Sequence, residues 1–262
     1  MSERKIQKFD IAYSLGCTCA PALYMRSLMM RFASGPFDWL AGGNFETRIH
    51  AIETDFCDFM REQDLELRER DFGFGLTFAH DYYHNVHNDL RHYHDFKTGV
   101  PLVETYPAVM EKYQRRMKRF IGDLSEKRTL LIWYALEQTT PDDTILKCCN
   151  KILERFGKNV HFLIIEHAEC DGVEYKRLDE NIERFSARLQ VLDENGHVKT
   201  MGDSSKMVKI LKGYAVRNSR SLYLRKQIKR TLVRISTLFI PIKSVRRNVR
   251  RKLYNEKALD WN

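Results

Sequence analysis

Two long, continuously apolar runs constrain the fold more than any other feature of this chain. Residues 128–136 read RTLLIWYAL, and residues 159–167 read NVHFLIIEH. Runs of this kind, with little polar alternation, are typical of strands buried on both faces in a parallel sheet. Between them, residues 140–157 carry apolar side chains at helical spacing, with Thr140 as the expected cap and Gly157 just past the end. We therefore expect a strand–helix–strand unit.

The same patterns predict further elements along the chain. Strands are expected at residues 9–16 and 187–193, and helices at residues 20–32, 44–62, 106–124 and 204–215. Residues 71–105 are rich in aromatics, Gly, Asn and His without a clear period, so short strands and long loops are expected there. The predicted fold class is α/β, a layered domain with a mainly parallel sheet, flanking helices and a basic helical C-terminal extension.

Charge divides the chain into two unequal parts. From residue 206 to the end there are 17 Lys and Arg but only 2 acidic residues, which leaves 27 basic and 33 acidic residues before it. A mildly acidic body is thus followed by a strongly basic tail. We predict an α/β catalytic domain over residues 1–203 and a basic extension over residues 204–262.

The N-terminus indicates where the protein is expected to reside. The first ten residues, MSERKIQKFD, are charged and lack the apolar core of a secretory signal. Six Cys without an export signal are typical of reduced thiols. No apolar run approaches the roughly 20 residues that span a bilayer. The expected location is the cytoplasm, including the inner face of the membrane as a peripheral protein.

The basic tail alternates positive charge with apolar residues at helical spacing. Leu224, Ile228, Leu232 and Ile235 fall on one helical face, and Pro241 interrupts the pattern. An anionic membrane surface and a partner protein both fit a basic face beside an apolar one, whereas nucleic acid is less favoured. A helical hairpin packed on the body fits the pattern equally well.

The first expected strand leads directly into a turn with two cysteines. Residues 14–22 read SLGCTCAPA, and a helix is expected to begin near Ala20. A thiol at such a turn lies near a helix N-terminus, whose dipole and N–H groups stabilise a thiolate or an oxyanion. Buried packing is the alternative for any free Cys. The C-x-C spacing does not suit a zinc site or a redox pair, so no metal is expected.

The stretches SLGCTCAPA and SGPFDWL together resemble the pattern S-L-G-x-x-C-x-x-A … P-F-D-W of a bacterial family of unknown function described as "putative papain-like cysteine peptidases". The family Cys falls on Cys19, whereas Cys17 falls on a variable position. The later stretch KYQRRMKRF also resembles the family, and the resemblance covers roughly residues 9–167. It implies acyl hydrolysis or acyl transfer with Cys19 as the nucleophile and a peptide substrate.

Histidines are concentrated in one segment, HDYYHNVHNDLRHYHD, at residues 80–95. A thiol nucleophile needs a His as base, and that His is usually oriented by a carboxylate. The family-like register favours His94 with Asp95, and His80 with Asp81 is the second candidate pair. Three of the His have a spacing that would suit a metal on a helix, but the aromatic and Asn content does not favour a helix there.

Four other polar residues are candidates for substrate binding. Asp38 lies in the PFDW motif, and Arg115, Arg116 and Arg119 lie on one predicted helix. Arg115 and Arg119 are one helical turn apart, a spacing that suits a clamp on a phosphate or carboxylate.

Two further functions stay open at this point. One is an acyltransferase of bacterial surface-polysaccharide biosynthesis, in which a Cys nucleophile would move an acyl group from coenzyme A onto a glycan. The other is a non-catalytic protein that binds a membrane or a glycan. A hydrolase of the first kind needs no cofactor.

Overall fold

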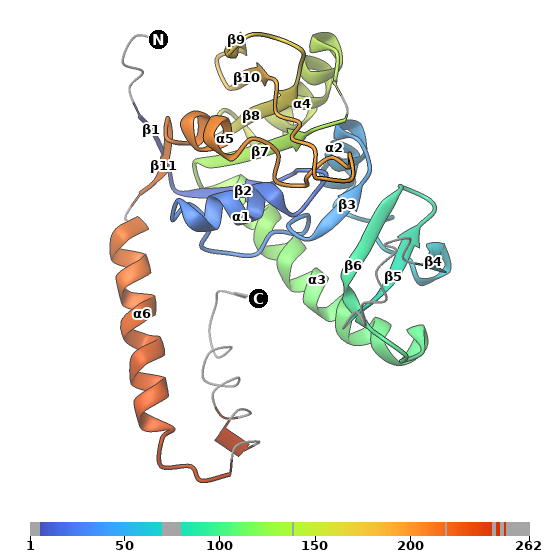
Figure 1. Ribbon diagram of the computed structural model, residues 1–262, viewed down its shortest axis with the longest axis vertical. Coiled ribbons are helices and arrows are strands. Elements are labelled where there is room, and N and C mark those ends of the chain that lie inside the picture. Colours follow the sequence, from blue (N-terminus) through green and yellow to red (C-terminus); the bar gives the residue numbers. More distant parts are fainter. Residues whose placement is uncertain are drawn as a thin grey trace.

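The computed structural model describes residues 6–69, 80–137, 139–217, 219–242, 245–246 and 249. Its central feature is a five-stranded sheet in the order β2-β7-β8-β10-β9 (Figure 1). The first four of these strands are parallel to their neighbours, and β9 is antiparallel to β10. The strands are β2 (Ile11–Ser14), β7 (Thr129–Ala135), β8 (Val160–His167), β9 (Val173–Asp179) and β10 (Ile182–Ala187).

Helices cover both faces of this sheet. The strand β7 illustrates why, because all of its residues are buried and successive side chains enter opposite core layers. Trp133 packs with the layer that includes α2, α3 and α4, whereas Tyr134 packs with the layer that includes α1 and α5. The bounds are α1 (Ala20–Ser27), α2 (Phe45–Glu53), α3 (Leu102–Glu126), α4 (Asp142–Phe156) and α5 (Ser204–Leu211).

A second sheet of four strands is antiparallel throughout and lies beside the first (Figure 1). Two of its strands, β5 and β6, come from residues 71–105, where we expected short strands and long loops. The protein is thus α/β, but the expectation of one mainly parallel sheet was too simple, because a separate antiparallel sheet accompanies it. In the order β3-β6-β5-β4, these strands are β3 (Leu40–Gly42), β6 (Leu90–Lys97), β5 (His80–Asn85) and β4 (Leu65–Arg68), the last preceded by the short helix η1 (Glu62–Asp64).

Local differences from the expected elements have physical reasons. The helix α4 begins one residue later than expected, with Pro141 in the cap position. Thr140, the expected cap, instead donates its hydroxyl to Glu166 Oε1 at 2.8 Å. The strand expected at residues 187–193 is also displaced, because its place beside β8 is taken by β10.

The C-terminal part of the chain first packs on the body through α5 and β11 (Tyr214–Val216) and then extends away from it as α6 (Ser219–Ser236) (Figure 1). The strand β11 pairs in parallel with β1 (Gln7–Phe9), and α5 and β11 both add buried residues to the core. The division at residues 203 and 204 stays a prediction. Within the described ranges, each helix is too short or too polar to cross a bilayer.

Candidate active site

The two cysteines lie in a tight turn between β2 and α1. Cys19 is the cap residue of α1, and its side chain makes no capping hydrogen bond. The Thr18 hydroxyl accepts a hydrogen bond from the backbone N–H of Ala20 at 3.2 Å instead. Gly16 permits the turn, because a Cβ atom there would lie 2.4 Å from Pro21 Cγ. The turn therefore presents Cys19 at the start of a helix, as the sequence predicts.

The two thiols have different surroundings. Cys17 donates to the backbone oxygen of Tyr134 at 3.3 Å and packs against the core. Burial raises the pKa of the Cys17 thiol, and the charge of Arg48 opposes this shift. Burial also raises the pKa of the half-buried Cys19 thiol, opposed only by its own backbone. Neither site favours a preformed thiolate, so a nucleophile here needs a base that removes its proton.

A bulge in β6 arranges the histidine segment. Asp81 pairs with Phe96 and Tyr83 pairs with His92, so a single residue of β5 faces three residues of β6. Extra residues of this kind interrupt the alternation of faces and redirect side chains. The bulge contains His94, whose side chain is exposed.

Asp95 is held in a buried polar network below this bulge. Its Oδ2 atom accepts from His92 Nδ1 at 2.9 Å and from the Tyr113 hydroxyl at 2.8 Å, and its Oδ1 atom accepts from Lys112 Nζ at 2.5 Å. Burial raises the pKa of Asp95, but the hydrogen bond from His92 and the charge of Lys112 outweigh it, and the net shift is downward. Asp95 is therefore ionised and orients His92, whereas the sequence predicts that it orients His94.

His94 and His80 lie near each other at the bulge. Their ring centroids are 6.4 Å apart, and the His94 ring is 5.9 Å from the ring of Trp39 in an edge-on contact. Asp81, the predicted partner of His80, accepts a hydrogen bond from the backbone N–H of Gly99 at 3.1 Å. The structure thus brings the two predicted bases together, with the Trp of the PFDW motif beside them.

The structure shows no direct interaction between Cys19 and these histidines within the described residues. Within the described part of the chain, no hydrogen bond, ion pair or charge interaction joins the Cys19 side chain to a His. The roles of Cys19, His94 and His80 therefore stay predictions.

The candidate substrate-binding residue Asp38 forms a buried ion pair with Arg31. Arg31 donates to Asp38 Oδ2 from Nε at 2.8 Å and from Nη2 at 2.6 Å, and the two side chains are 2% and 1% exposed. Burial raises the pKa of Asp38, and the Arg31 charge opposes this shift. The pair holds the loop of the PFDW motif in place. Asp38 thus has a structural role that does not depend on a substrate.

The three candidate arginines of α3 have different partners. Arg115 is exposed and pairs with Glu111 at 2.6 Å, and Arg119 donates to the backbone oxygen of Ser34 at 2.6 Å. Arg116 is buried, with its guanidinium 5.6 Å from the centroid of the Tyr113 ring. The predicted clamp of Arg115 and Arg119 is thus divided between two different partners.

No metal site is apparent in the described residues, which contain no group of three or more His, Cys, Asp and Glu that could hold an ion. The three His that suggested metal spacing are separated by the strand geometry of β5. His84 hydrogen-bonds Asp89 at 2.8 Å through Nε2, and His87 lies in the turn that follows β5.

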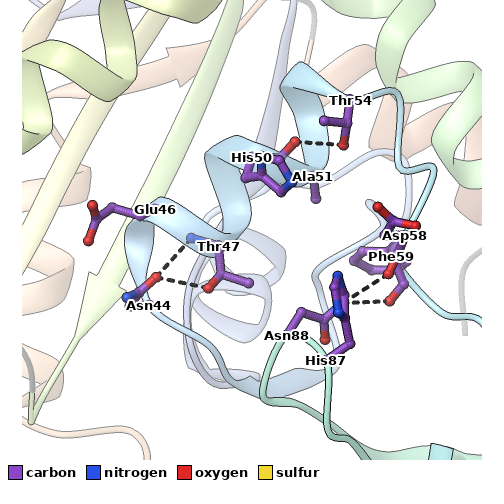
Figure 2. A pocket seen from close by; sticks show the side chains of 10 residues that line it. All are labelled: Asn44, Glu46, Thr47, His50, Ala51, Thr54, Asp58, Phe59, His87 and Asn88. Atoms are coloured by element: carbon purple, nitrogen blue, oxygen red, sulfur yellow. Dashed lines mark hydrogen bonds between the residues drawn. The ribbon is translucent and has the colours of Figure 1, made fainter. Parts of the chain in front are cut away.

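A surface pocket of about 360 Å³ lies between α2 and the turn after β5 (Figure 2). Figure 2 shows His50 of α2 and Thr54, directly after α2, on one side and His87 and Asn88 on the other. Asn88 closes one wall by donating to the backbone oxygen of Phe59 at 3.0 Å. The pocket shares no residue with the Cys19 turn or the bulge, so we assign it no catalytic role.

Comparison with known proteins places the chain in a family. A family model described as "Putative papain-like cysteine peptidase (DUF1796)" matches residues 10–167, more than half of the chain. The chain belongs to this family. The matched part contains the Cys19 turn, the PFDW loop, the bulge and α3. The match confirms the family resemblance of SLGCTCAPA and SGPFDWL.

The other comparisons give no further information on the function of the chain. An uncharacterised protein of Acanthamoeba polyphaga mimivirus is 26% identical over 130 residues, which cover 45% of this chain and 58% of that protein. The chain thus spans less than two thirds of the length of this curated relative. No solved structure matches the chain.

His92 is a polar residue of this region that the sequence pattern does not single out. It is fully buried, and its Nε2 atom has no hydrogen-bond partner among the described residues. Its spacing of three residues from Asp95 signals a pairing only if the strand bulges, since residues three apart in a regular strand point to opposite faces. No sequence pattern in β6 predicts that bulge.

Proposed function

We propose that this member of the papain-like family is a cysteine hydrolase that cleaves peptides, with Cys19 as its nucleophile. The observation that carries the proposal is the position of Cys19 at the start of α1 directly after β2. This strand–turn–helix device exposes a nucleophile at the sheet edge and supplies N–H groups for an oxyanion. The sequence resemblance implies that Cys19 is the family Cys, and Cys19 lies within the residues that the family model matches.

The proposed base is His94, with His80 as its neighbour. His94 is exposed on the bulge, and the edge-on contact with Trp39 limits the positions of its ring. The anchored His92 and Asp95 hold the bulge from below, so in this proposal Asp95 is a positioning residue. Because burial raises the pKa of Cys19, the proposed mechanism is general-base catalysis rather than attack by a resting thiolate.

The proposed reaction has two steps. The Cys19 sulfur attacks the carbonyl carbon as His94 takes the thiol proton, and N–H groups at the start of α1 hold the oxyanion. His94 then donates the proton to the leaving amine, and water hydrolyses the thioester. Catalytic hydrogen bonds are often long before substrate binds, so attack would require His94 to approach the thiol in the complex.

A fluorogenic peptide library tests this proposal. Cleavage by the wild-type chain should fall by about a hundredfold or more in Cys19→Ala and in His94→Ala, because each removes a reacting group. Cys17→Ala is the matched control and should retain most of the activity. Equal loss in both Cys variants, or full activity of Cys19→Ala, would refute the assignment.

A further inference from the structure

The helix α6 carries an uncovered apolar stripe. Leu224, Ile228, Leu232 and Ile235 are 60%, 51%, 61% and 52% exposed. Their spacing of four, four and three residues places all of them on one face of the helix. Isolated exposed apolar residues are ordinary, but a continuous stripe of this length marks a surface that meets a partner.

The apolar surface continues past the end of α6. Leu238, Phe239 and Ile242 are 60%, 87% and 59% exposed. Phe239 is a large aromatic side chain left almost entirely uncovered. A bilayer interface readily accepts such a side chain, because one ring can enter the acyl boundary without a preformed pocket.

Positive charge lies beside this stripe. The 18 residues of α6 include six Lys and Arg and no acidic residue. Arg225 and Lys229 are exposed, and each directly follows a residue of the stripe, so they border it along one edge. This arrangement is that of a helix lying in the interface plane, with apolar residues facing inward and cations at the headgroups.

The shape of the molecule leaves this surface accessible. In Figure 1, α6 projects away from the two sheets instead of packing along them. Among the residues of this part whose burial the structure describes, only Val233 and Thr237 are buried, and neither belongs to the stripe. The stripe therefore has no partner of comparable size within the described part of the body.

Charge decides which partner fits. A second copy of α6 would bring two strongly basic surfaces together, and like charges oppose such pairing. A nucleic acid would use the cations but leaves an apolar stripe unexplained. An anionic lipid surface uses both features.

We propose that α6 and residues 237–242 lie in the interface of an anionic phospholipid bilayer. The stripe and Phe239 enter the acyl boundary, and Lys and Arg contact the headgroups. The proposal is independent of the proposed hydrolase, since it rests on residues outside the family match.

Vesicle flotation with the full chain tests the proposal. At low salt, the wild type should bind vesicles with about 30% phosphatidylserine at least tenfold more than pure phosphatidylcholine vesicles, and about 0.5 M salt should reduce this binding several-fold. Replacing the stripe by Leu224→Ser, Ile228→Ser, Leu232→Ser and Ile235→Ser should abolish flotation. Arg225→Glu with Lys229→Glu should weaken it at least tenfold without removing an apolar group.

The matched control is Lys147→Glu with Lys199→Glu, which makes the same charge change at exposed positions of the body and should leave flotation unchanged. Circular dichroism and thermal unfolding verify that each variant folds. Three results would overturn the proposal: equal binding to both vesicle types, tighter binding to a DNA oligonucleotide than to anionic vesicles, or a dimer that the stripe variant dissociates and that does not float.

Discussion

Asp95 accepts a hydrogen bond from Nδ1 of His92 at 2.9 Å, and their side chains are only 3% and 0% exposed. The two residues are the ends of the short segment that forms the β6 bulge. Their contact closes the segment on its buried side, and His94, which lies between them, is exposed. The buried pair thus holds His92 in the interior and leaves His94 at the surface.

Removing the charge of Asp95 should destabilise the fold. Asp95→Asn leaves Lys112 without its carboxylate and weakens the hold on His92, so we expect a loss of about 3 kcal/mol in the free energy of unfolding at pH 7. Urea denaturation measures this loss. Glu111→Gln breaks an exposed ion pair on α3, the helix that also carries Lys112, and should cost less than about 1 kcal/mol. Equal effects of the two substitutions would contradict the account.

The Asp95 network should also leave a signature in acid. The pKa of Asp95 is lowered in the folded state, so its contribution to stability is present above the unfolded value, about 4, and is lost as the pH falls below it. Wild type should therefore lose more stability than Asp95→Asn between about pH 5 and pH 3. Parallel curves for the two proteins would show that this carboxylate does not contribute in the expected sense.

The ion pair of Arg31 and Asp38 should behave differently from a surface pair. Arg31→Met leaves a fully buried carboxylate without its cation, which costs about 3–5 kcal/mol. Arg115→Met on the exposed face of α3 is the control and should cost less than about 1 kcal/mol. Adding Asp38→Asn to Arg31→Met should recover part of the loss, and a further loss would argue against an unpaired charge as the cause.

Gly42 should be intolerant of a side chain. It has φ of +66°, and a Cβ atom there would lie 2.2 Å from the backbone oxygen of Asp89. Gly42→Ala should cost more than about 2 kcal/mol by thermal or urea unfolding, because strain and a clash with backbone add together. Gly99→Ala has a similar φ of +72° but open space around it, so only the strain of about 1–2 kcal/mol should appear.

The sequence supports prediction of the central sheet better than of the second one. The strands β7 and β8 are continuously apolar because both of their faces are covered, and this signal is local. The strand β5 reads HDYYHN, and its polar and aromatic side chains face partly buried surroundings that only the neighbouring strands create. Thr140 is similar, since its distant partner Glu166 outweighs its local tendency to cap a helix.

In the candidate site too, features that depend on adjacent residues could be predicted, whereas those that depend on strand pairing could not. The position of Cys19 follows from a strand, a Gly and a helix start that are adjacent in the sequence. The pairing of Asp95 with His92 depends on the bulge, which arises from the register of β5 against β6. The family-like register therefore favoured a pairing of Asp95 with His94, which the bulge replaces by a pairing with His92.

The half-buried thiol of Cys19 should resist deprotonation until substrate is present. Burial raises its pKa above the usual value near 9, so alkylation by iodoacetamide in Cys17→Ala should keep rising above pH 9. N-acetylcysteine measured alongside should level off earlier. A plateau near neutral pH would indicate a resting thiolate and contradict general-base catalysis.

The most direct test of the central claim is to trap the acyl-enzyme. The chain is mixed with an activated acyl ester, quenched in acid and analysed by mass spectrometry with fragmentation, because Cys17 and Cys19 fall in the same tryptic peptide. The account predicts one acyl group on Cys19 in wild type and in Cys17→Ala, and none at this turn in Cys19→Ala. An acyl group on Cys17, or an equal yield in Cys19→Ala, would contradict it.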